Sequence, residues 1–223
     1  MPESAMWIAM GSGVAGLSAL GLTAWWARRH FEVTKSAVDA VLGSVALVLF
    51  LPVMGVCALL IKASDGGPVM YIQTRVGKGG RLFRMYKLRT MYVNAESRTG
   101  AVWARHGDPR VMPMCRWMRL SHVDELPQLV NVIKGEMSLV GPRPERPEIL
   151  DELEKVYPDV RRRLAVRPGI TGLAQITNGY DTSIEGFRHK LRSDLEYIER
   201  RRWSLEIRIL AATLSKFRDR SAK

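Results

Sequence analysis

Two long apolar segments without a charged residue dominate the first part of the chain. They cover residues 5–26 and 40–61. At a rise of about 1.5 Å per residue, a helix over either segment is long enough to cross a hydrocarbon core of about 30 Å. Trp25 and Trp26, followed by two arginines, are typical of a membrane–water interface. We therefore expect an N-terminal transmembrane helix over residues 1–30.

Small residues recur along the first apolar segment on one face of the expected helix. They permit close packing against another helix, but a plain membrane anchor explains the segment equally well, and the sequence leaves both alternatives open. The residues concerned are Gly11, Ala15, Ala19 and Thr23.

The second apolar segment contains Pro52 near its middle. Proline removes one backbone donor and crowds the preceding turn, so a helix is expected to kink or break there. A kinked helix that crosses the membrane is one interpretation. Basic residues at both ends, Lys35 before the segment and Lys62 after it, favour another, because basic flanks tend to stay cytoplasmic. We predict a re-entrant membrane helix over residues 31–66 that is broken at Pro52 and returns to the same face.

From residue 67 onward the pattern becomes that of a folded domain outside the bilayer, which we expect over residues 67–223. The segments VMYIQT and RLFRMYKL flank VGKGG, which predicts a short β-hairpin. The sequence LVNVI after Pro127 predicts a helix that ends at Gly135. Three prolines within residues 141–148 exclude a regular helix there.

Two amphipathic helices are predicted at the end of the chain. One apolar face comprises Phe187, Leu191, Leu195 and Ile198, and the other comprises Trp203, Ile207, Leu210, Leu214 and Phe217. Either face can pack against the domain or lie in a membrane interface, and both alternatives stay open. The predicted fold is mainly α with a small β-hairpin. It is a membrane-associated, monotopic α/β domain with a proline-broken re-entrant helix, amphipathic interfacial helices and an added N-terminal transmembrane helix.

The chain is strongly basic, with 34 Lys and Arg against 22 Asp and Glu and a formal net charge of +12. Such a charge favours an anionic partner, which can be nucleic acid, a phosphate ester or an acidic membrane face. The two cysteines, Cys57 and Cys115, match no metal-binding spacing, and a disulfide framework is not expected.

Asp124 and Glu125 are adjacent acids just before Pro127, a residue that helices tolerate only in their first turn. The two acids therefore lie at or just before a helix N-terminus, where free N–H groups attract phosphate. One acid can attack phosphorus as a nucleophile, and the other can hold Mg²⁺. Ser121 with Asp124 also fits a capping box, so a purely structural role for Asp124 is the alternative.

Several basic residues occupy positions from which they can neutralise phosphate. Arg143 lies between two prolines, and Arg167 begins an RPG turn, so both have little backbone freedom to lose. Lys87 and Arg89 lie in KLRT at the end of the predicted hairpin. Each of these residues taken alone is more often a solvated surface charge.

Taken together, these segments resemble a known family. The motifs, which occur in this order, are KLRTM (87–91), DPRV (108–111), DELPQLVNVIKGEMSLVGPRP (124–144), RPGITGLAQ (167–175) and the D-x-x-Y of Asp194 and Tyr197. They are similar to those of the bacterial sugar transferases of the monotopic phosphoglycosyl transferase superfamily. The resemblance covers about Lys35 to Leu214, and the apolar run with a central proline resembles that family's re-entrant helix.

The resemblance implies an activity and a location. Such enzymes move a sugar 1-phosphate from a UDP-sugar to undecaprenyl phosphate, release UMP, and initiate exopolysaccharide, capsule or O-antigen type glycan assembly. The implied location is the bacterial inner (cytoplasmic) membrane, with the catalytic domain on the cytoplasmic face, in contact with membrane lipids and without a nucleic-acid partner. The number of copies in the assembly stays open, a homodimer included.

The resemblance also implies roles for individual residues. The family's nucleophile, which forms a covalent aspartyl-phosphosugar intermediate, matches Asp124. Its metal-binding glutamate, with Mg²⁺ as the cofactor, matches Glu125. Its basic substrate-contacting positions match Lys87, Arg119, Arg143 and Arg167, and we add Arg89 to this predicted substrate-binding group.

The choice of sugar and some departures from the family pattern remain open. The segments SIEGFRHKL and GPRPERPE are more similar to the hexose-1-phosphate transferases of the family, which favours glucose or galactose over an acetamido sugar. His122 stands where a small or hydroxylated residue is expected, and Glu206 stands where aspartate is common.

Two alternatives from other classes are a membrane-anchored nucleic-acid-binding protein, suggested by the charge, and a non-catalytic membrane scaffold. The sequence contains no nucleic-acid-binding motif, and aromatic residues are sparse in its basic stretches. The intact Asp124–Glu125 pair speaks against a scaffold.

Overall fold

The computed structural model describes the backbone of residues 3–95, 107–177 and 186–218, and the side chains of residues 29–95, 107–177 and 186–215. The chain divides into two compact units, residues 1–38 and residues 39–223. The tryptophan pair, the small-residue stripe of the first segment and Phe217 lie outside the described side chains.

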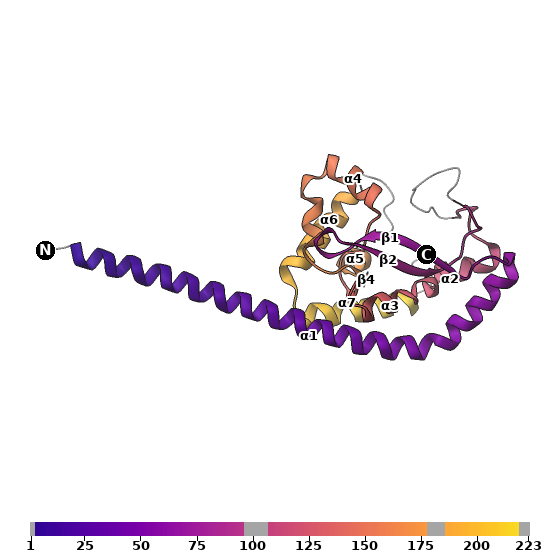
Figure 1. Cartoon of the computed structure of the whole chain (residues 1–223), viewed down its shortest axis with the longest axis horizontal. Helices are drawn as coiled ribbons and strands as arrows, with labels where there is room; N and C mark the ends of the chain where they lie inside the picture. The colour runs from indigo at the N-terminus through magenta and orange to yellow at the C-terminus, as the bar shows by residue number, and fades with distance from the viewer. Residues whose placement is uncertain (1–2, 96–106, 178–185, 219–223) are drawn as a thin grey trace. The chain divides into compact units, whose positions relative to one another are not determined.

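The longest element is helix α1, which covers Glu3–Asp65 and contains Pro52. Within the described residues, its part Arg29–Asp65 is the one helix long and apolar enough to cross a membrane. The helix does not break at Pro52 as expected. It continues through this residue and curves over its later part (Figure 1). Proline removes one helical hydrogen bond and its ring clashes with the carbonyl four residues back, and a bend in the helix relieves that clash. Re-entry into the same leaflet stays a prediction.

The predicted β-hairpin is confirmed. Strands β1 (Met70–Val76) and β2 (Leu82–Leu88) pair antiparallel from Met70 opposite Leu88 to Val76 opposite Leu82. The 3-10 turn η1 (Lys78–Gly80) joins them and carries two glycines in left-handed conformations, at φ 65° and 80°. Glycine enters this region of backbone space without steric cost.

A second pair of strands was not predicted. Strands β3 (Ser138–Val140) and β4 (Gly169–Thr171) run parallel, with Ser138 opposite Gly169. Gly141, directly after β3, and Gly169, the first residue of β4, lie against each other. A Cβ on Gly169 would lie 2.1 Å from the Gly141 nitrogen, so the two backbones can approach only without side chains there.

Short helices and turns make up most of the remaining described chain. The helices are α2 (Arg116–Leu120), α3 (Gln128–Ile133), α4 (Pro147–Val156), α5 (Leu173–Thr177), α6 (Phe187–Arg200) and α7 (Trp203–Arg218), and the 3-10 turns are η2 (Pro113–Cys115), η3 (Val123–Glu125) and η4 (Pro158–Ala165). As predicted, α3 ends just before Gly135, which has a positive φ of 75°. The fold is mostly helical with two small two-stranded sheets.

The end of α1 belongs to the core of the second unit. Cys57 and Ile61 are fully buried in a cluster with Leu88, Met112 and Met118. Burial of a side chain such as Ile61 stabilises a fold by about 1.5–3 kcal/mol. The same helix leaves many apolar side chains exposed between residues 41 and 59: Val41, Leu42, Val45, Val48, Leu49, Phe50, Leu51, Val53, Val56 and Leu59.

The two C-terminal helices use their apolar faces differently. In α6, Phe187 and Leu191 are buried, so this face packs against the domain, one of the two alternatives left open by the sequence. In α7, Ile209 is fully buried, but Ile207 and Leu214 are 64% and 67% exposed. The apolar stripe predicted for the last helix therefore faces partly away from the domain, which favours the membrane-interface alternative for α7.

Candidate active site

The two neighbouring acids lie on the short turn η3 that leads into α3. His122, directly before this turn, has the left-handed conformation (φ 53°, ψ 17°), which redirects the chain after α2. The Ser121 hydroxyl donates to the Trp117 carbonyl oxygen at 2.7 Å. The capping box predicted for Ser121 and Asp124 is therefore not formed, because that hydroxyl bonds back into its own helix instead.

Glu125 is buried and surrounded by positive charge. Lys87 Nζ donates to Glu125 Oε1 at 2.9 Å, and Arg143 Nη1 donates to Oε2 at 3.1 Å, while Arg143 Nη2 donates to Oε1. Burial alone would raise the pKa of Glu125, but Arg143 and Lys87 outweigh it and hold the pKa well below its usual range. Glu125 is therefore ionised throughout the physiological pH range.

Asp124 is also buried, with 6% of its surface exposed, but its electrostatic balance is the reverse. Burial and the negative charge of Glu125 raise the pKa of Asp124 to about 6, against the opposing charges of Lys87, Arg119 and Arg143. At pH 7 about nine tenths of such a group is ionised. Two adjacent carboxyls with separated pKa values are typical of an active site in which the acids have different roles.

The cations beside the acids come from separate elements. Lys87 is the last residue but one of β2, and burial lowers its pKa despite the charge of Glu125. Arg119 lies in α2 and donates to the Thr90 hydroxyl at 3.3 Å. Arg143 lies on the segment after β3, which we call the 141–145 loop.

Two hydrogen bonds attach the 141–145 loop to β4. The Gly141 N–H donates to the Thr171 carbonyl at 2.8 Å, and the Gly169 N–H donates to the Pro142 carbonyl at 3.0 Å. The close glycine approach makes both bonds sterically feasible. The backbone that carries Arg143 is therefore fixed on both sides of Pro142.

The structure does not bring Arg89 and Arg167 into this group. Arg89 is buried and makes two hydrogen bonds to the Asp65 carboxylate at the end of α1, of 2.6 and 2.5 Å. Arg167 Nη2 lies 3.9 Å from Oδ2 of Asp39, a residue of α1. Asp39 also accepts a 2.7 Å hydrogen bond from the Ser138 hydroxyl. Contact of either arginine with substrate stays a prediction.

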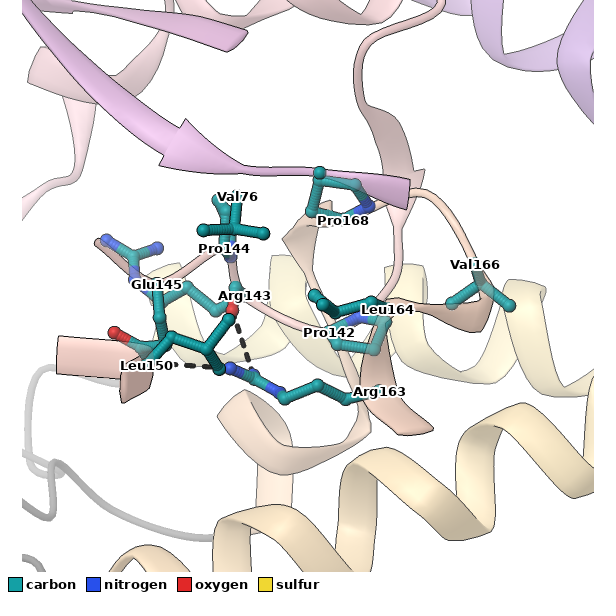
Figure 2. Close-up of a pocket in the computed structure, with 11 residues that line it drawn as sticks. Val76, Pro142, Arg143, Pro144, Glu145, Leu150, Arg163, Leu164, Val166 and Pro168 are labelled. Atoms are coloured by element: carbon teal, nitrogen blue, oxygen red, sulfur yellow. Dashed lines mark hydrogen bonds and ion pairs between the residues drawn. The ribbon is translucent and has the colours of Figure 1, made fainter. Parts of the chain in front are cut away.

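Sequence reasoning missed three charged residues behind the 141–145 loop. Glu145, Arg163 and Arg75 are largely buried and bond to the loop or to one another. Figure 2 shows Arg163 and Glu145 in the small hollow beside the loop, whose lining includes Pro142, Arg143 and Pro144. Glu145 follows GPRP directly, which was a usable signal. Arg163 is the last of three consecutive arginines, and nothing in the run distinguishes it.

The two acids provide the donor chemistry that Mg²⁺ requires. This ion is usually held by one or two carboxylates, with substrate phosphates and waters as its other ligands. Within the described residues, no cluster of three or more His, Cys, Asp or Glu side chains could hold a metal by itself. The carboxylate of Glu125, the predicted metal ligand, fits this donor chemistry, and Mg²⁺ binding stays a prediction.

Comparison with known proteins decides the family. The sequence profile described as "Bacterial sugar transferase" matches residues 30–220. The chain belongs to the bacterial sugar transferase family. The resemblance inferred from the motifs is thereby confirmed, and the acid pair, the 141–145 loop and the hairpin all lie within the part that matches.

Relatives in this family carry names that differ in their sugar. A UDP-N-acetylgalactosamine–undecaprenyl-phosphate N-acetylgalactosaminephosphotransferase of Aeromonas hydrophila is 42% identical over 82% of this chain and 43% of its own length. A UDP-glucose:undecaprenyl-phosphate glucose-1-phosphate transferase of Caulobacter vibrioides is 38% identical over 82% of this chain and 69% of its own. The Escherichia coli protein of the same name is 38% identical over 83% of this chain and 40% of its own. The chain thus spans less than half the length of the first and third of these relatives.

Proposed function

We propose that this chain transfers a sugar 1-phosphate from a UDP-sugar to undecaprenyl phosphate, releases UMP, and so initiates the assembly of a bacterial glycan. Membership of the bacterial sugar transferase family and the activities for which its relatives are named support this proposal. The observation that carries it is the buried Asp124–Glu125 pair beside Lys87, Arg119 and Arg143. A basic site whose cations offset the charge of two buried carboxylates suits a diphosphate that must approach one of them.

In the proposed reaction, Asp124 is the nucleophile. Its carboxylate oxygen forms a bond to the phosphorus that carries the sugar, and the bond from that phosphorus to the bridging oxygen breaks, so that UMP leaves with the electron pair. A phosphate oxygen of undecaprenyl phosphate then attacks the same phosphorus and frees the Asp124 carboxylate. The sugar 1-phosphate is thereby joined to the lipid through a new diphosphate linkage.

The cations stabilise the negative charge that gathers during both steps. Lys87 and Arg143 already bond to Glu125, yet an ammonium has three donors and a guanidinium has five, so each can also reach a phosphate oxygen. Glu125 would hold Mg²⁺, which when bound screens the phosphate charge and orients the diphosphate. Arg119 adds a further positive charge, which acts to lower the pKa of Asp124.

We further propose that the chain acts at the cytoplasmic face of the bacterial inner membrane. The exposed apolar side chains of α1 and of α7, among them Leu49, Ile207 and Leu214, are costly in water and suit the acyl region of one leaflet. Both substrates would then meet where lipid and cytoplasm join. For the sugar we retain glucose or galactose as the favoured choice and an acetamido sugar as the alternative, since relatives of both kinds match the chain.

Turnover by the extracted protein tests this proposal. Membrane-extracted protein is incubated with candidate UDP-sugars, Mg²⁺ and undecaprenyl phosphate, and UMP is measured. Asp124→Asn should abolish UMP release, because an amide cannot attack phosphorus. Asp151→Asn is the matched control, since Asp151 is exposed on α4 and far along the chain from the acid pair. Undiminished turnover in Asp124→Asn would remove Asp124 from the mechanism.

Two further measurements separate the covalent step from the metal requirement. Intact-mass analysis after mixing the protein with UDP-sugar alone should show the added mass of one phosphosugar on the wild type and none on Asp124→Asn. Exhaustive EDTA treatment should stop UMP release, and Glu125→Gln should raise the Mg²⁺ concentration needed for half-maximal activity. Full activity after EDTA treatment would exclude the metal.

A further inference from the structure

Two arginines from different elements, the buried Arg163 and the partly buried Arg75, donate to the carbonyls of the 141–145 loop. Arg163 Nη2, from η4, donates to the Arg143 carbonyl at 2.9 Å. Arg75 Nη1, from β1, donates to the Pro144 carbonyl at 2.9 Å. In Figure 2 the Arg163 guanidinium points toward the Arg143 carbonyl and toward Glu145. The backbone of Arg143 is therefore held from two directions in addition to its bonds with β4.

Glu145, at the end of the same loop, is the shared counter-ion of these arginines. Its carboxylate lies 3.7 Å from Arg163 Nη1 and 3.9 Å from Arg75 Nη1, and it accepts a hydrogen bond from Lys190 Nζ. Its backbone carbonyl also accepts from the Val76 N–H at 3.0 Å. Burial would raise the pKa of Glu145, but Lys190 and Arg163 outweigh it and lower the pKa to about 2. Glu145 therefore attracts Arg75 and Arg163, the same two residues that donate to the backbone carbonyls of the loop.

Asp194 of α6 completes the arrangement. Its Oδ2 accepts hydrogen bonds from Arg163 Nε at 3.0 Å and from Arg163 Nη2 at 2.6 Å, and both side chains are almost fully buried. Buried charges are tolerated only when they are paired and hydrogen-bonded, so such a network is rigid. Asp194 thus fixes the guanidinium plane of Arg163, and Arg163 in turn fixes the Arg143 carbonyl.

We propose that Arg75 and Arg163 are positioning residues, which act through the backbone of the 141–145 loop to aim the Arg143 guanidinium at the diphosphate of the substrate, with Glu145 as their common counter-ion. This inference rests on the proposed function for the identity of the anion. An arginine whose backbone is fixed loses less conformational freedom on binding than one on a mobile loop, and misplacement by about 1 Å costs about a hundredfold in rate.

A double-mutant cycle tests the route through Arg143. Arg163→Lys keeps the positive charge beside Glu145, but the lysine ammonium cannot bond to Asp194 and to the Arg143 carbonyl with the geometry of the planar guanidinium. We expect this variant to lower kcat/KM and UDP affinity about tenfold to a hundredfold. In an Arg143→Gln background, Arg163→Lys should lower kcat/KM and UDP affinity by less than about threefold, because the Arg143 side chain that Arg163 positions is gone. Arg162→Lys, an exposed neighbour on η4, is the matched control and should change neither quantity.

The outcomes distinguish the inference from the proposed reaction. Equal losses in both backgrounds, or no loss in either, would overturn the positioning role. Arg75→Lys, which breaks the bond to Pro144 without disturbing Asp194, provides a second variant if Arg163→Lys does not fold, and failure of both to fold would make the residues merely structural and overturn the role. UDP binding with the expected cycle, but no UMP release by wild type with any UDP-sugar, would leave the positioning role standing and remove the reaction.

Discussion

Asp124 and Glu125 are neighbours in the chain whose carboxylates have opposite surroundings. Glu125 bonds to Lys87 and Arg143, which lie 38 and 18 residues away in sequence, whereas burial and the charge of Glu125 dominate the environment of Asp124. The sequence identified both acids and the cations Lys87, Arg119 and Arg143. It could not assign which acid each cation pairs with, because that depends on long-range packing of β2 and the 141–145 loop against η3.

The raised pKa of Asp124 leads to a prediction about pH. The ionised form is the nucleophile, and its fraction falls as pH falls through about 6, so the first step should slow about tenfold per pH unit below that value. Glu125, whose pKa lies well below its usual range, stays ionised over the same interval. The measurement is single-turnover release of UMP from UDP-sugar alone between pH 5 and 8, because a lipid phosphate itself titrates near pH 6.

Two results decide this prediction. A rate that is independent of pH down to 5 would show that Asp124 is not the titrating nucleophile. Thermal unfolding recorded at each pH is the control, since loss of folded protein at low pH would also lower the rate.

The conformation of His122 leads to a second prediction. At φ 53° this residue lies in the left-handed region, which asparagine and histidine adopt more readily than other non-glycine residues and β-branched residues adopt least. His122→Val should lower the free energy of unfolding by about 1–2 kcal/mol more than His122→Asn does. Chemical denaturation of the detergent-solubilised variants measures the difference. Equal stability of the two variants would mean that the turn before the acids is not under this backbone constraint.

Among the elements, those with a strong local pattern were predictable and the short ones were not. Alternation in β1 and β2, and the proline and glycine around α3, led to correct predictions of the hairpin and that helix. Strands β3 and β4 have three residues each, too few for a pattern, and they exist because Gly141 and Gly169 allow two backbones to approach. In α7 the apolar stripe was recognised, but only the structure shows that Glu206 and Ile209 face the domain while Ile207 does not.

The curvature of α1 around Pro52 leads to a prediction about membrane topology. If the helix re-enters, both ends of residues 40–61 lie on the cytoplasmic side. Single cysteines replace Thr34 and Lys62, which are exposed whereas Lys35 is buried, in a background without Cys57 and Cys115. Both should resist a membrane-impermeant maleimide in intact spheroplasts and react after lysis.

Two further variants complete this experiment. Pro52→Leu should favour a straight spanning helix, because it restores the missing hydrogen bond, and turnover in cells should then fall. Reaction of one site alone in intact wild-type spheroplasts would mean that the segment spans the membrane, and the re-entrant prediction would be wrong.

For the whole molecule, one apolar helix can serve the core of a folded domain as well as a membrane. Cys57 and Ile61 lie in the apolar segment 40–61 and are core residues, and Asp39, just before that segment, bonds to Ser138. Hydropathy cannot separate side chains that face lipid from side chains that face a protein core, because both are apolar. The second compact unit accordingly begins at Asp39.

This division leads to a prediction for a truncated chain. A variant that lacks residues 1–28 retains all of the second unit and all of the part that matches the family. It should keep UMP release within about threefold of the full-length protein, because the acid pair and the cations around it all lie in the second unit. Turnover of the two forms is compared at equal amounts of folded protein in the same vesicles. A folded but inactive truncated protein would show that the first unit is needed for turnover.

The hydrogen bond between Asp39 and Ser138 has a consequence for the way this protein is made. The two residues are 99 positions apart, and a bacterial ribosome adds roughly 5–20 residues per second. For roughly 5–20 s after Asp39 is added to the growing chain, Ser138 has not been synthesised. The order of synthesis therefore places formation of α1 before closure of the domain. The hydrogen bond that joins this helix to β3 can form only once β3 has been made.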